Sequence, residues 1–299
     1  MIDFIKGTVR GADISRLYEL FDFETTVINS TGEVKREIAL FNTMKIIIYP
    51  SGRVVIQGSI HKYFNSINEL YAPNQTSIKE REMGFNGNRF DLLSLTYALN
   101  HLCESLGVRL IDLIISNLEF GLNLETEFKV PEILSRLIRH RGEPFVNPKK
   151  YFYQAEHAQY FVKCYYKSWQ YGMMYEVMRV ELKYTRMAAL NAIGIYTVQD
   201  LLKSDCLLQL GELLSNKWYE ILLYDYTINT GAVSAKKQVW LTQYRDQDFW
   251  NSETKPNHHA RHKKRLSEIV ENHSKQVQKQ VQKQIESEWI NLQAESKSV

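Results

Sequence analysis

Two strongly alternating segments lie close together between Tyr160 and Met187. Apolar and polar residues alternate in both, and this period of two is typical of β-strands because successive side chains point to opposite faces of a sheet. We therefore expect two neighbouring strands, each with one apolar and one polar face. The polar faces hold Lys163, Tyr165 and Lys167 in the first segment and Arg179, Glu181 and Lys183 in the second.

A turn at about residues 171–174 would join these segments as an antiparallel hairpin. Odd-numbered residues would then pair with odd-numbered ones, so the two polar faces would coincide. A tyrosine, a carboxylate and several cations would share one surface. A half-solvated ribbon whose charges only maintain solubility would show the same pattern, so the rest of the chain has to decide between the two interpretations.

The excess of positive charge lies near the C-terminus. The chain of 299 residues has 37 Lys and Arg against 34 Asp and Glu, and residues 253–299 hold 9 of the bases and 6 of the acids. Basic and acidic residues are therefore equal in number within residues 1–252. The segment with the excess includes Arg261, Lys263, Lys264 and Arg265, and we expect it to bind phosphates without reading sequence.

The composition predicts a cytoplasmic protein that does not enter a membrane. Cys103, Cys164 and Cys206 are odd in number and lack metal-type spacing, which favours buried thiols in a reducing compartment. The first residues lack the apolar run of a signal peptide, and no later stretch approaches the roughly 20 apolar residues of a membrane span.

Two earlier segments repeat the division into an apolar and a polar face. Residues 44–64 predict a hairpin around Pro50 to Gly52, whose second strand puts His61 on its polar face beside Lys62. Residues 113–125 predict a strand with leucines on one face and Glu119 and Asn123 on the other.

We predict an α+β fold, an antiparallel sheet with helices packed on one face, followed by a helical C-terminal extension. Asn88 resembles an N-cap, and the helical spacing after it, ended by Gly107, indicates the clearest helix. The expected units are a catalytic domain at 1–195, a helical extension at 196–250, and a basic hinge with a mostly solvated amphipathic helix at 251–299. The apolar stripe of that helix could alternatively mediate dimerisation; it consists of Val277, Val281, Ile285 and Trp289.

The polar residues of the four strands suit phosphoryl transfer from DNA to a tyrosine. Such chemistry uses a phenolic nucleophile, cations around the phosphate, and a divalent metal on carboxylates. Because a tyrosine has an ordinary pKa of about 10, it needs a metal-organised or cation-rich site at neutral pH.

The same segments resemble the replication initiators of filamentous phages, of the gene II protein type, and their relatives in bacterial phages and plasmids. The matching runs are GSIHKYFNSIN, ISNLEFGLNL, FVKCYYKSWQ and YEVMRVELKYTRMAALNAIGI, in the order and spacing of that family. The similarity covers about residues 44–200, and the joint order of the motifs is more specific than any one of them. It implies rolling-circle replication initiation.

The resemblance implies a role for several residues. Tyr165 would be the nucleophile, Lys167 would contact the scissile phosphate, and Glu119 and Glu181 would be the acidic residues, binding Mg²⁺ or Mn²⁺ with His61 as a third candidate ligand. The adjacent Tyr166 is a second candidate nucleophile. The strand pattern favours Tyr165, because Tyr166 would share a face with apolar residues. The other expected DNA contacts are Lys62, Lys163, Arg179 and Lys183. The implied partners are origin DNA, single-stranded or extruded from a duplex, and host helicase and polymerase.

Two other functions fit the same residues. A non-catalytic protein that binds single-stranded nucleic acid would use Tyr165 and Tyr166 as stacking platforms. A mobilisation relaxase would use the same transesterification for DNA transfer, but the histidines here lie mostly near the C-terminus, at His258, His259, His262 and His273.

Overall fold

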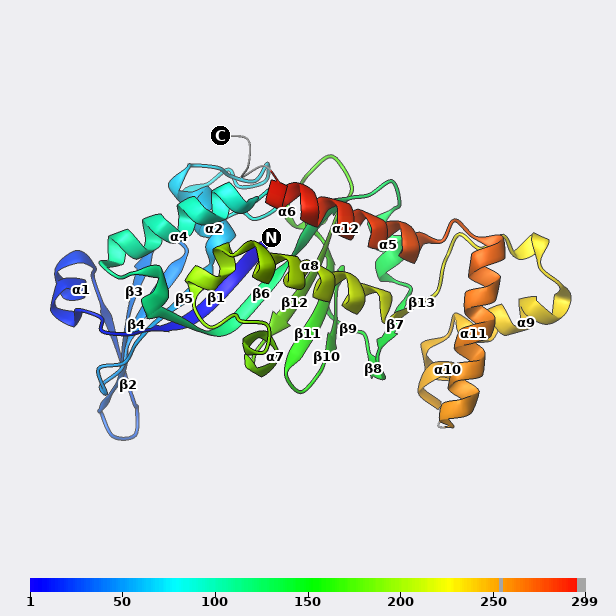
Figure 1. Cartoon of the computed structure of the whole chain (residues 1–299), viewed down its shortest axis with the longest axis horizontal. Helices are drawn as coiled ribbons and strands as arrows, with labels where there is room; N and C mark the ends of the chain where they lie inside the picture. The colour runs from blue at the N-terminus through cyan, green and yellow to red at the C-terminus, as the bar shows by residue number, and fades with distance from the viewer. Residues whose placement is uncertain (253–254, 295–299) are drawn as a thin grey trace.

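A ten-stranded antiparallel sheet forms the centre of the protein (Figure 1). The computed structural model describes residues 1–252 and 255–294. The strands of the sheet are β1 (Ile2–Val9), β2 (Glu24–Val27), β3 (Val34–Phe41), β4 (Met44–Ile48), β5 (Val54–Ser59), β6 (Leu113–Glu125), β9 (Val146–Lys149), β10 (Phe152–Glu156), β11 (Tyr160–Tyr166) and β12 (Val177–Tyr184). They lie in the order β2-β3-β4-β5-β1-β6-β12-β11-β10-β9.

Three long helices cover one face of this sheet: α4 (Leu92–Leu106), α8 (Ser204–Tyr219) and α12 (Val277–Ala294) (Figure 1). Their apolar residues share one core with the inward residues of the strands. In β6 these are the predicted core residues Leu118, Phe120, Leu122 and Leu124, all buried. The structure confirms the predicted α+β class with helices on one face.

The shorter elements connect the strands or extend the sheet. The helices are α1 (Ile14–Leu20), α2 (Ile60–Ile67), α3 (Ile78–Glu82), α5 (Val130–Leu134), α6 (Lys167–Tyr171), α7 (Ala188–Asn191), α9 (Ala235–Tyr244), α10 (Gln247–Ser252) and α11 (Pro256–His273), with single 3₁₀ turns at Leu110–Asp112, Val198–Leu202 and Thr230–Ala232. A second sheet contains β7 (Leu137–His140), β8 (Glu143–Pro144) and β13 (Ile221–Leu223).

The hairpin predicted at residues 44–64 ends earlier than expected. β4 and β5 pair around Gly52, whose φ of +77° suits glycine. The side chain of Ser59 then accepts a hydrogen bond from the backbone N–H of Lys62, which starts α2. His61 therefore lies on a helix, and the prediction that placed it on a strand face is wrong.

The helix predicted after Asn88 is α4, and Gly107 ends it with a left-handed φ of +67°. Its N-cap is Asp91, whose side chain accepts from the backbone N–H of Ser94 at 2.8 Å. The side chain of Asn88 instead bonds His61 and Asn65. The helix was predicted correctly, but its cap was not.

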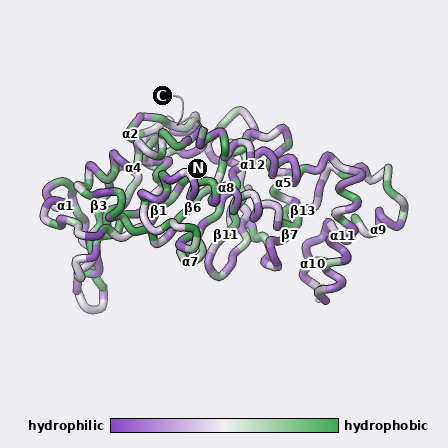
Figure 2. The backbone as a smooth tube through the Cα atoms, viewed as in Figure 1, coloured by the Kyte–Doolittle hydropathy of each residue, from purple (hydrophilic) through white to green (hydrophobic). Residues whose placement is uncertain are grey.

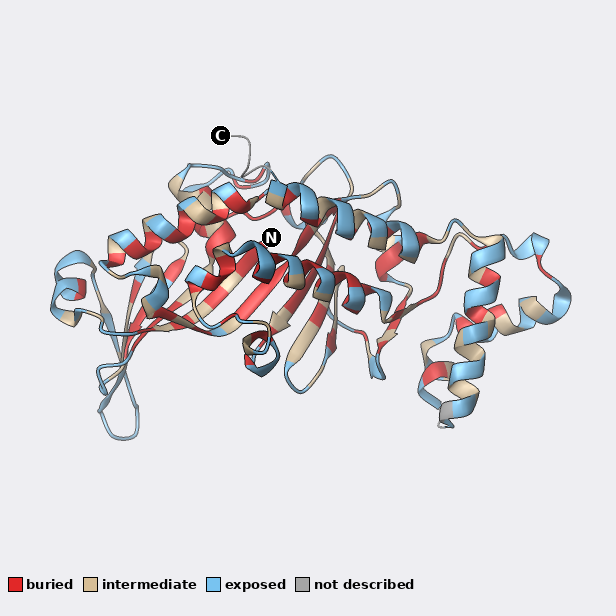
Figure 3. Cartoon of the chain, viewed as in Figure 1, coloured by how far each residue is buried: buried red, intermediate tan, exposed pale blue. Residues whose placement is uncertain are grey.

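Residues from 224–252 and 255–273 build a small second core beside the main sheet, together with Ile138. α9, α10 and α11 pack Tyr244, Trp250, Leu266 and Ile269 together, and most of their surface is exposed or half-buried (Figure 3). Much of this region is hydrophilic (Figure 2). The basic segment expected to be a flexible hinge forms the 18-residue helix α11, because two of its apolar residues pack into this core.

α12 returns to the main sheet and packs along α8 (Figure 1). The stripe Val277, Val281, Ile285 and Trp289 is buried in the main core, so the expectation of a solvated or dimerising helix is wrong. The indole of Trp289 donates to the backbone oxygen of Leu207 at 2.8 Å and lies against Gly211. The main core thus crosses the expected unit boundaries at residues 195 and 250. Within the described residues, no helix is long and apolar enough to span a membrane.

Candidate active site

The two strands that dominate the sequence pair as predicted. In β11 and β12, Lys163 faces Glu181 and Tyr165 faces Arg179, so odd-numbered residues meet and the polar faces coincide. This polar face is opposite the helices, since Val180 and Leu182 point into the core.

The connection between these strands differs from the tight turn expected at residues 171–174. α6 occupies residues 167–171, and Gly172 ends it with a φ of +66°. Lys167 is therefore the first residue of a helix and not a strand residue. Its side chain still reaches the tyrosine, because the ammonium lies 4.9 Å from the centroid of the Tyr165 ring.

The hydroxyl of Tyr165 donates a hydrogen bond to Oε2 of Glu181 at 3.0 Å. The same oxygen accepts from Nε of Arg179 at 2.7 Å. Burial would raise the pKa of Glu181, but Lys163 and Arg179 lower it to about 2. Burial, followed by the Glu181 carboxylate, raises the pKa of Tyr165 well above 10. A neutral phenol thus faces an ionised carboxylate.

Lys163 bridges the two acidic residues of the site. Its ammonium donates to Oε2 of Glu119 at 2.7 Å and to Oε1 of Glu181 at 3.0 Å. The other Glu119 oxygen lies 2.8 Å from the ammonium of Lys183. Burial alone would lower the pKa of Lys163, but Glu181 and Glu119 raise it above its ordinary value. Lys163 therefore remains charged and forms an ion pair with each carboxylate.

Asp3 completes the network from the middle of the sheet. The pairing of β1 with β6 shifts register between Ile2 and Phe4, and such a bulge re-aims the intervening side chain. The buried Asp3 carboxylate accepts from both Ser59 and Asn86, and lies 3.4 Å from Nη2 of Arg179. Arg179 thereby connects the Asp3 and Glu181 carboxylates.

Lys167 is a buried cation whose pKa is close to neutrality. Its ammonium donates to Oδ1 of Asn86 at 2.6 Å, and the Tyr171 hydroxyl donates to the same oxygen. Burial, and next the charge of Arg179, lower the pKa of Lys167 to about 7. This amine therefore changes charge in the neutral range.

Gly121 makes room for Glu181. The two residues are directly opposite in the pairing of β6 with β12. A Cβ at Gly121 would lie 2.1 Å from the backbone oxygen of Val180 and 2.6 Å from Cα of Glu181. Any larger residue would push the carboxylate out of its position.

Tyr165 lines an open cavity of about 600 Å³ on the polar face of the sheet. Lys62 lines it as well, with its ammonium bonded to the backbone oxygen of Met83 at 2.7 Å. Burial lowers the pKa of Lys62. The polar and charged residues around this cavity are Asp3, Ser59, Lys62, Asn86, Glu119, Lys149, Lys150, Gln154, Lys163, Lys167, Gln170 and Glu181.

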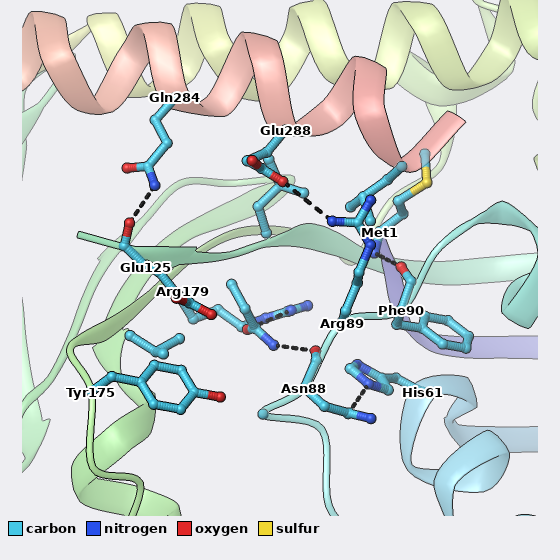
Figure 4. Close-up of a pocket in the computed structure, with 15 residues that line it drawn as sticks. Met1, His61, Asn88, Arg89, Phe90, Glu125, Tyr175, Arg179, Gln284 and Glu288 are labelled. Carbon is cyan, nitrogen blue, oxygen red and sulfur yellow. Dashed lines mark hydrogen bonds and ion pairs between the residues drawn. The ribbon is translucent and has the colours of Figure 1, made fainter. Parts of the chain in front are cut away.

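His61 lies in a different cavity, of about 330 Å³, below α12 (Figure 4). Its Nε2 is 2.7 Å from Oδ1 of Asn88, and its ring stacks on Phe90 with centroids 4.5 Å apart. Burial lowers the pKa of His61 well below its ordinary value. Arg179 lines this second cavity too, where Nη1 donates to Oδ1 of Asn123 at 3.1 Å.

The three candidate metal ligands do not converge. Glu119 and Glu181 share Lys163 as their counterion, whereas His61 is bonded to an asparagine in the other cavity. Across residues 1–252 and 255–294, no group of three or more His, Cys, Asp or Glu side chains could hold a metal ion. As arranged, the donors do not fit a divalent cation, because an ammonium occupies the space between the two carboxylates.

The hydroxyl of Tyr166 points away from this network, although the residue also lines the Tyr165 cavity, where its ring centroid lies 5.8 Å from that of Tyr151. Its hydroxyl donates to Oε1 of Glu176 at 2.8 Å, and its ring packs against the core. Burial, followed by the bond to Glu176, raises the pKa of Tyr166 to about 12. The predicted separation of the two tyrosines onto opposite faces is correct.

The expected DNA-binding cations fall into two environments. Lys163 and Arg179 are held inside the network, and Arg179 is only 1% exposed, which does not fit direct contact with a DNA phosphate. The Lys183 side chain is 30% exposed. On α11, Arg261 and Lys264 are exposed.

The other two α11 cations are half-buried. Arg265 lies 4.5 Å from the centroid of the Trp240 ring. Burial, followed by the charge of Arg139, lowers the pKa of Lys263.

Sequence reasoning missed three residues of the network: Asp3, Asn86 and Tyr171. Asn86 lies in the segment GFNGN, which reads as a surface loop, and its partners are more than 80 positions away. An Asn between two glycines is the only local signal, because such a segment lets the backbone approach closely.

No protein-family model matches this sequence, and no curated protein matches it either. Among solved structures, the chain is similar to a rolling circle replication initiator protein from Geobacillus stearothermophilus. The match has 13% sequence identity and a TM-score of 0.37, and covers 82% of this chain and 96% of the other. At that level of similarity the function has to be argued from the site itself.

Proposed function

We propose that this chain initiates rolling-circle replication by cleaving one strand of its origin DNA with Tyr165. The observation that supports this best is the 3.0 Å hydrogen bond from the Tyr165 hydroxyl to the ionised Glu181, at an open cavity that Lys167 also lines. A phenol, a proton acceptor and a cation at one open cavity are the parts that a tyrosine transesterification needs.

In the proposed reaction, Oη of Tyr165 forms a bond to the phosphorus of the scissile phosphodiester while the bond from phosphorus to the 3′ oxygen breaks. The phenolic hydroxyl becomes strongly acidic only as Oη bonds to phosphorus, and its proton then passes to Glu181, whose pKa of about 2 makes it a weak base. The protonated form of Lys167 gives a proton to the departing 3′ oxygen. The products are a 5′ phosphotyrosyl link and a free 3′ hydroxyl that can prime synthesis. The reverse reaction rejoins the strand after a round of replication.

Arg179 acts in this scheme as a positioning residue. It is hydrogen-bonded to Glu181 and Asn123 and forms an ion pair with Asp3, which fixes the acceptor carboxylate opposite the phenol. A preorganised charged network of this kind costs little rearrangement during the reaction.

Mg²⁺ or Mn²⁺ would supply a Lewis acid for the phosphate when bound. Glu119 and Glu181 are the side chains that could hold such an ion, but the Lys163 ammonium already lies between them. The proposed steps therefore use only side chains of this chain. Origin DNA, single-stranded or extruded, is the proposed substrate, with host helicase and polymerase as later partners in the cytoplasm.

The test is covalent capture. The protein is incubated with single-stranded oligonucleotides that tile its replicon, and a protein–DNA adduct is sought by denaturing electrophoresis. Tyr165→Phe should abolish the adduct and leave DNA binding within about threefold, because only the hydroxyl is lost. Tyr166→Phe is the matched control and should retain the adduct. An active Tyr165→Phe with an inactive Tyr166→Phe would reverse the assignment.

A non-catalytic protein that binds single-stranded nucleic acid is the second candidate. The raised pKa of Tyr165 favours it, since a phenol that resists ionisation can serve as a stacking ring. Strand binding without an adduct on any oligonucleotide would support this alternative.

A further inference from the structure

Two aromatic rings, the exposed Trp169 and the half-buried Tyr151, form a cluster with two exposed lysines at the Tyr165 cavity. Trp169 is 53% exposed, and its ring meets that of Tyr151 edge to face with centroids 5.6 Å apart. Lys149 and Lys150 are exposed beside them. All four residues line the same cavity as Tyr165. We call this group the aromatic platform.

The backbone at Tyr151 is strained. Its φ of +58° lies in the left-handed region, which a bulky residue rarely adopts. Gly or Asn would serve a simple turn between β9 and β10 at lower cost. The strained turn places both Tyr151 and Phe152 at this cavity.

The platform is continuous with the tyrosine site. Phe152 pairs with Tyr165 across β10 and β11, and their rings have centroids 5.2 Å apart. Lys150 lies over both platform rings, 5.1 Å from the centroid of Tyr151 and 5.5 Å from that of Trp169. Rings and cations thus extend from solvent to the hydroxyl that would attack the phosphate.

We propose that Trp169 and Tyr151 stack an unpaired base of single-stranded DNA, while Lys149 and Lys150 bind the adjacent phosphates. A base inside a duplex already has stacking neighbours on both faces, so the exposed ring of Trp169 can stack only on an unpaired base. The acidic residues of the cavity, Asp3, Glu119 and Glu181, are each paired with cations, which leaves the two rim lysines to attract phosphate. This inference rests on the proposed function and specifies how its substrate enters.

The test measures binding of a short oligothymidylate and of a duplex of equal length by fluorescence anisotropy, using the full chain. Trp169→Ala should weaken single-strand binding by about 5- to 150-fold, the range for loss of one stacked base, and duplex binding by less than about twofold. Trp169→Phe should retain most of the affinity because it keeps a ring. Tyr219→Ala is the matched control and should leave both affinities unchanged, since that ring is 69% exposed but lies at the end of α8 and does not line the Tyr165 cavity.

The lysines are tested by salt titration. Lys150→Gln should reduce the slope of log K against log salt by about 0.7 on single-stranded DNA, whereas Trp169→Ala should leave the slope unchanged. Unchanged single-strand affinity in Trp169→Ala, or equal losses for single strand and duplex, would overturn the platform. Tighter binding of oligouridylate than of oligothymidylate would overturn DNA as its ligand. If Trp169→Ala loses affinity as expected but no oligonucleotide gives an adduct, the platform stands and the proposed cleavage fails.

Discussion

The hydroxyl of Tyr165 and Nε of Arg179 share one acceptor, Oε2 of Glu181, at 3.0 Å and 2.7 Å. The guanidinium thus fixes the oxygen that would receive the phenolic proton. It also explains how a buried glutamate stays ionised, because Arg179 and Lys163 together outweigh the effect of burial on the pKa of Glu181.

Removing that charge should stop the reaction. Glu181→Gln should reduce adduct formation by at least about 100-fold, since general base catalysis typically contributes that much or more. Glu119→Gln is the matched control and should lose less, because Glu119 contacts Lys163 and Lys183 but not the phenol. The initial rate of adduct formation is the measurement. A larger loss in Glu119→Gln would show that Glu119, and not Glu181, accepts the phenolic proton.

Lys167 should give the reaction a pH limit near neutrality. Burial, followed by Arg179, lowers its pKa to about 7, so the free protein loses the proposed proton donor as the pH rises above that value. The value of kcat/KM should then fall about tenfold per pH unit above about 7, because this parameter reports the free enzyme.

Lys167→Arg provides the check on that assignment. A guanidinium does not lose its proton in this range, so the residual kcat/KM of the variant should not fall as the pH rises above about 7. Activity of the unaltered protein that rises through pH 7 would instead make the neutral amine of Lys167 a base.

The polar face of β11 and β12 could be predicted because it follows from one local rule. Side chains alternate along a strand, and antiparallel pairing through a short connection keeps odd residues opposite odd ones. That rule placed Lys163, Tyr165 and Glu181 together correctly. It could not place Lys167, because the start of α6 depends on how residues 167–171 pack and not on the alternation.

The other half of the network was not predictable, since it depends on distant contacts. Asp3 faces the site only because a bulge interrupts its strand, and no residue type near it signals that bulge. The burial of the apolar stripe of α12 could not be predicted either. Its spacing predicts a helix with one apolar face, but the pattern is the same whether that face meets solvent, a second chain or, as here, the main core through Trp289.

The position of Lys163 allows a test of the metal hypothesis. Lys163→Met removes the ammonium between Glu119 and Glu181 and leaves two carboxylates that repel each other. We expect this variant to bind Mn²⁺ at least about tenfold more tightly than the unaltered protein, as measured by calorimetry. Equal or weaker binding in the variant would mean that the carboxylates hold the metal with Lys163 in place, and chelation by EDTA should then stop adduct formation.

A second buried cluster should make the stability of the fold depend on pH. His140 is fully buried, with Nδ1 2.7 Å from Nε2 of His157 and Nε2 3.1 Å from Glu220, near Lys217 and Arg141. Burial, followed by the charge of His157, lowers the pKa of His140 to about 4.

The unfolded chain, with an ordinary histidine pKa of about 6.5, therefore binds a proton that the folded chain does not. The contribution of His140 is fully present above about pH 6.5 and is lost as the pH falls toward 4. His140→Gln should flatten the fall of the urea midpoint over this range, and the half-buried His273→Gln should not. A slope that is unchanged in His140→Gln would assign the dependence to other groups such as His61, whose pKa is also lowered.

The cations of α11 can be tested without disturbing the fold. Truncating the C-terminal segment is unsuitable, since it would remove Trp289 and its neighbours from the main core. Arg261 and Lys264 are exposed, so a double substitution to Gln should leave the thermal midpoint unchanged. If both bind phosphates, the slope of log K against log salt on duplex DNA should fall by about 1.8, with weaker binding to every sequence alike. Lys236→Gln with Lys237→Gln on α9 is the matched control of equal charge. An unchanged slope would exclude α11 from the DNA interface, and a shifted cleavage position would show that this helix helps to select the origin.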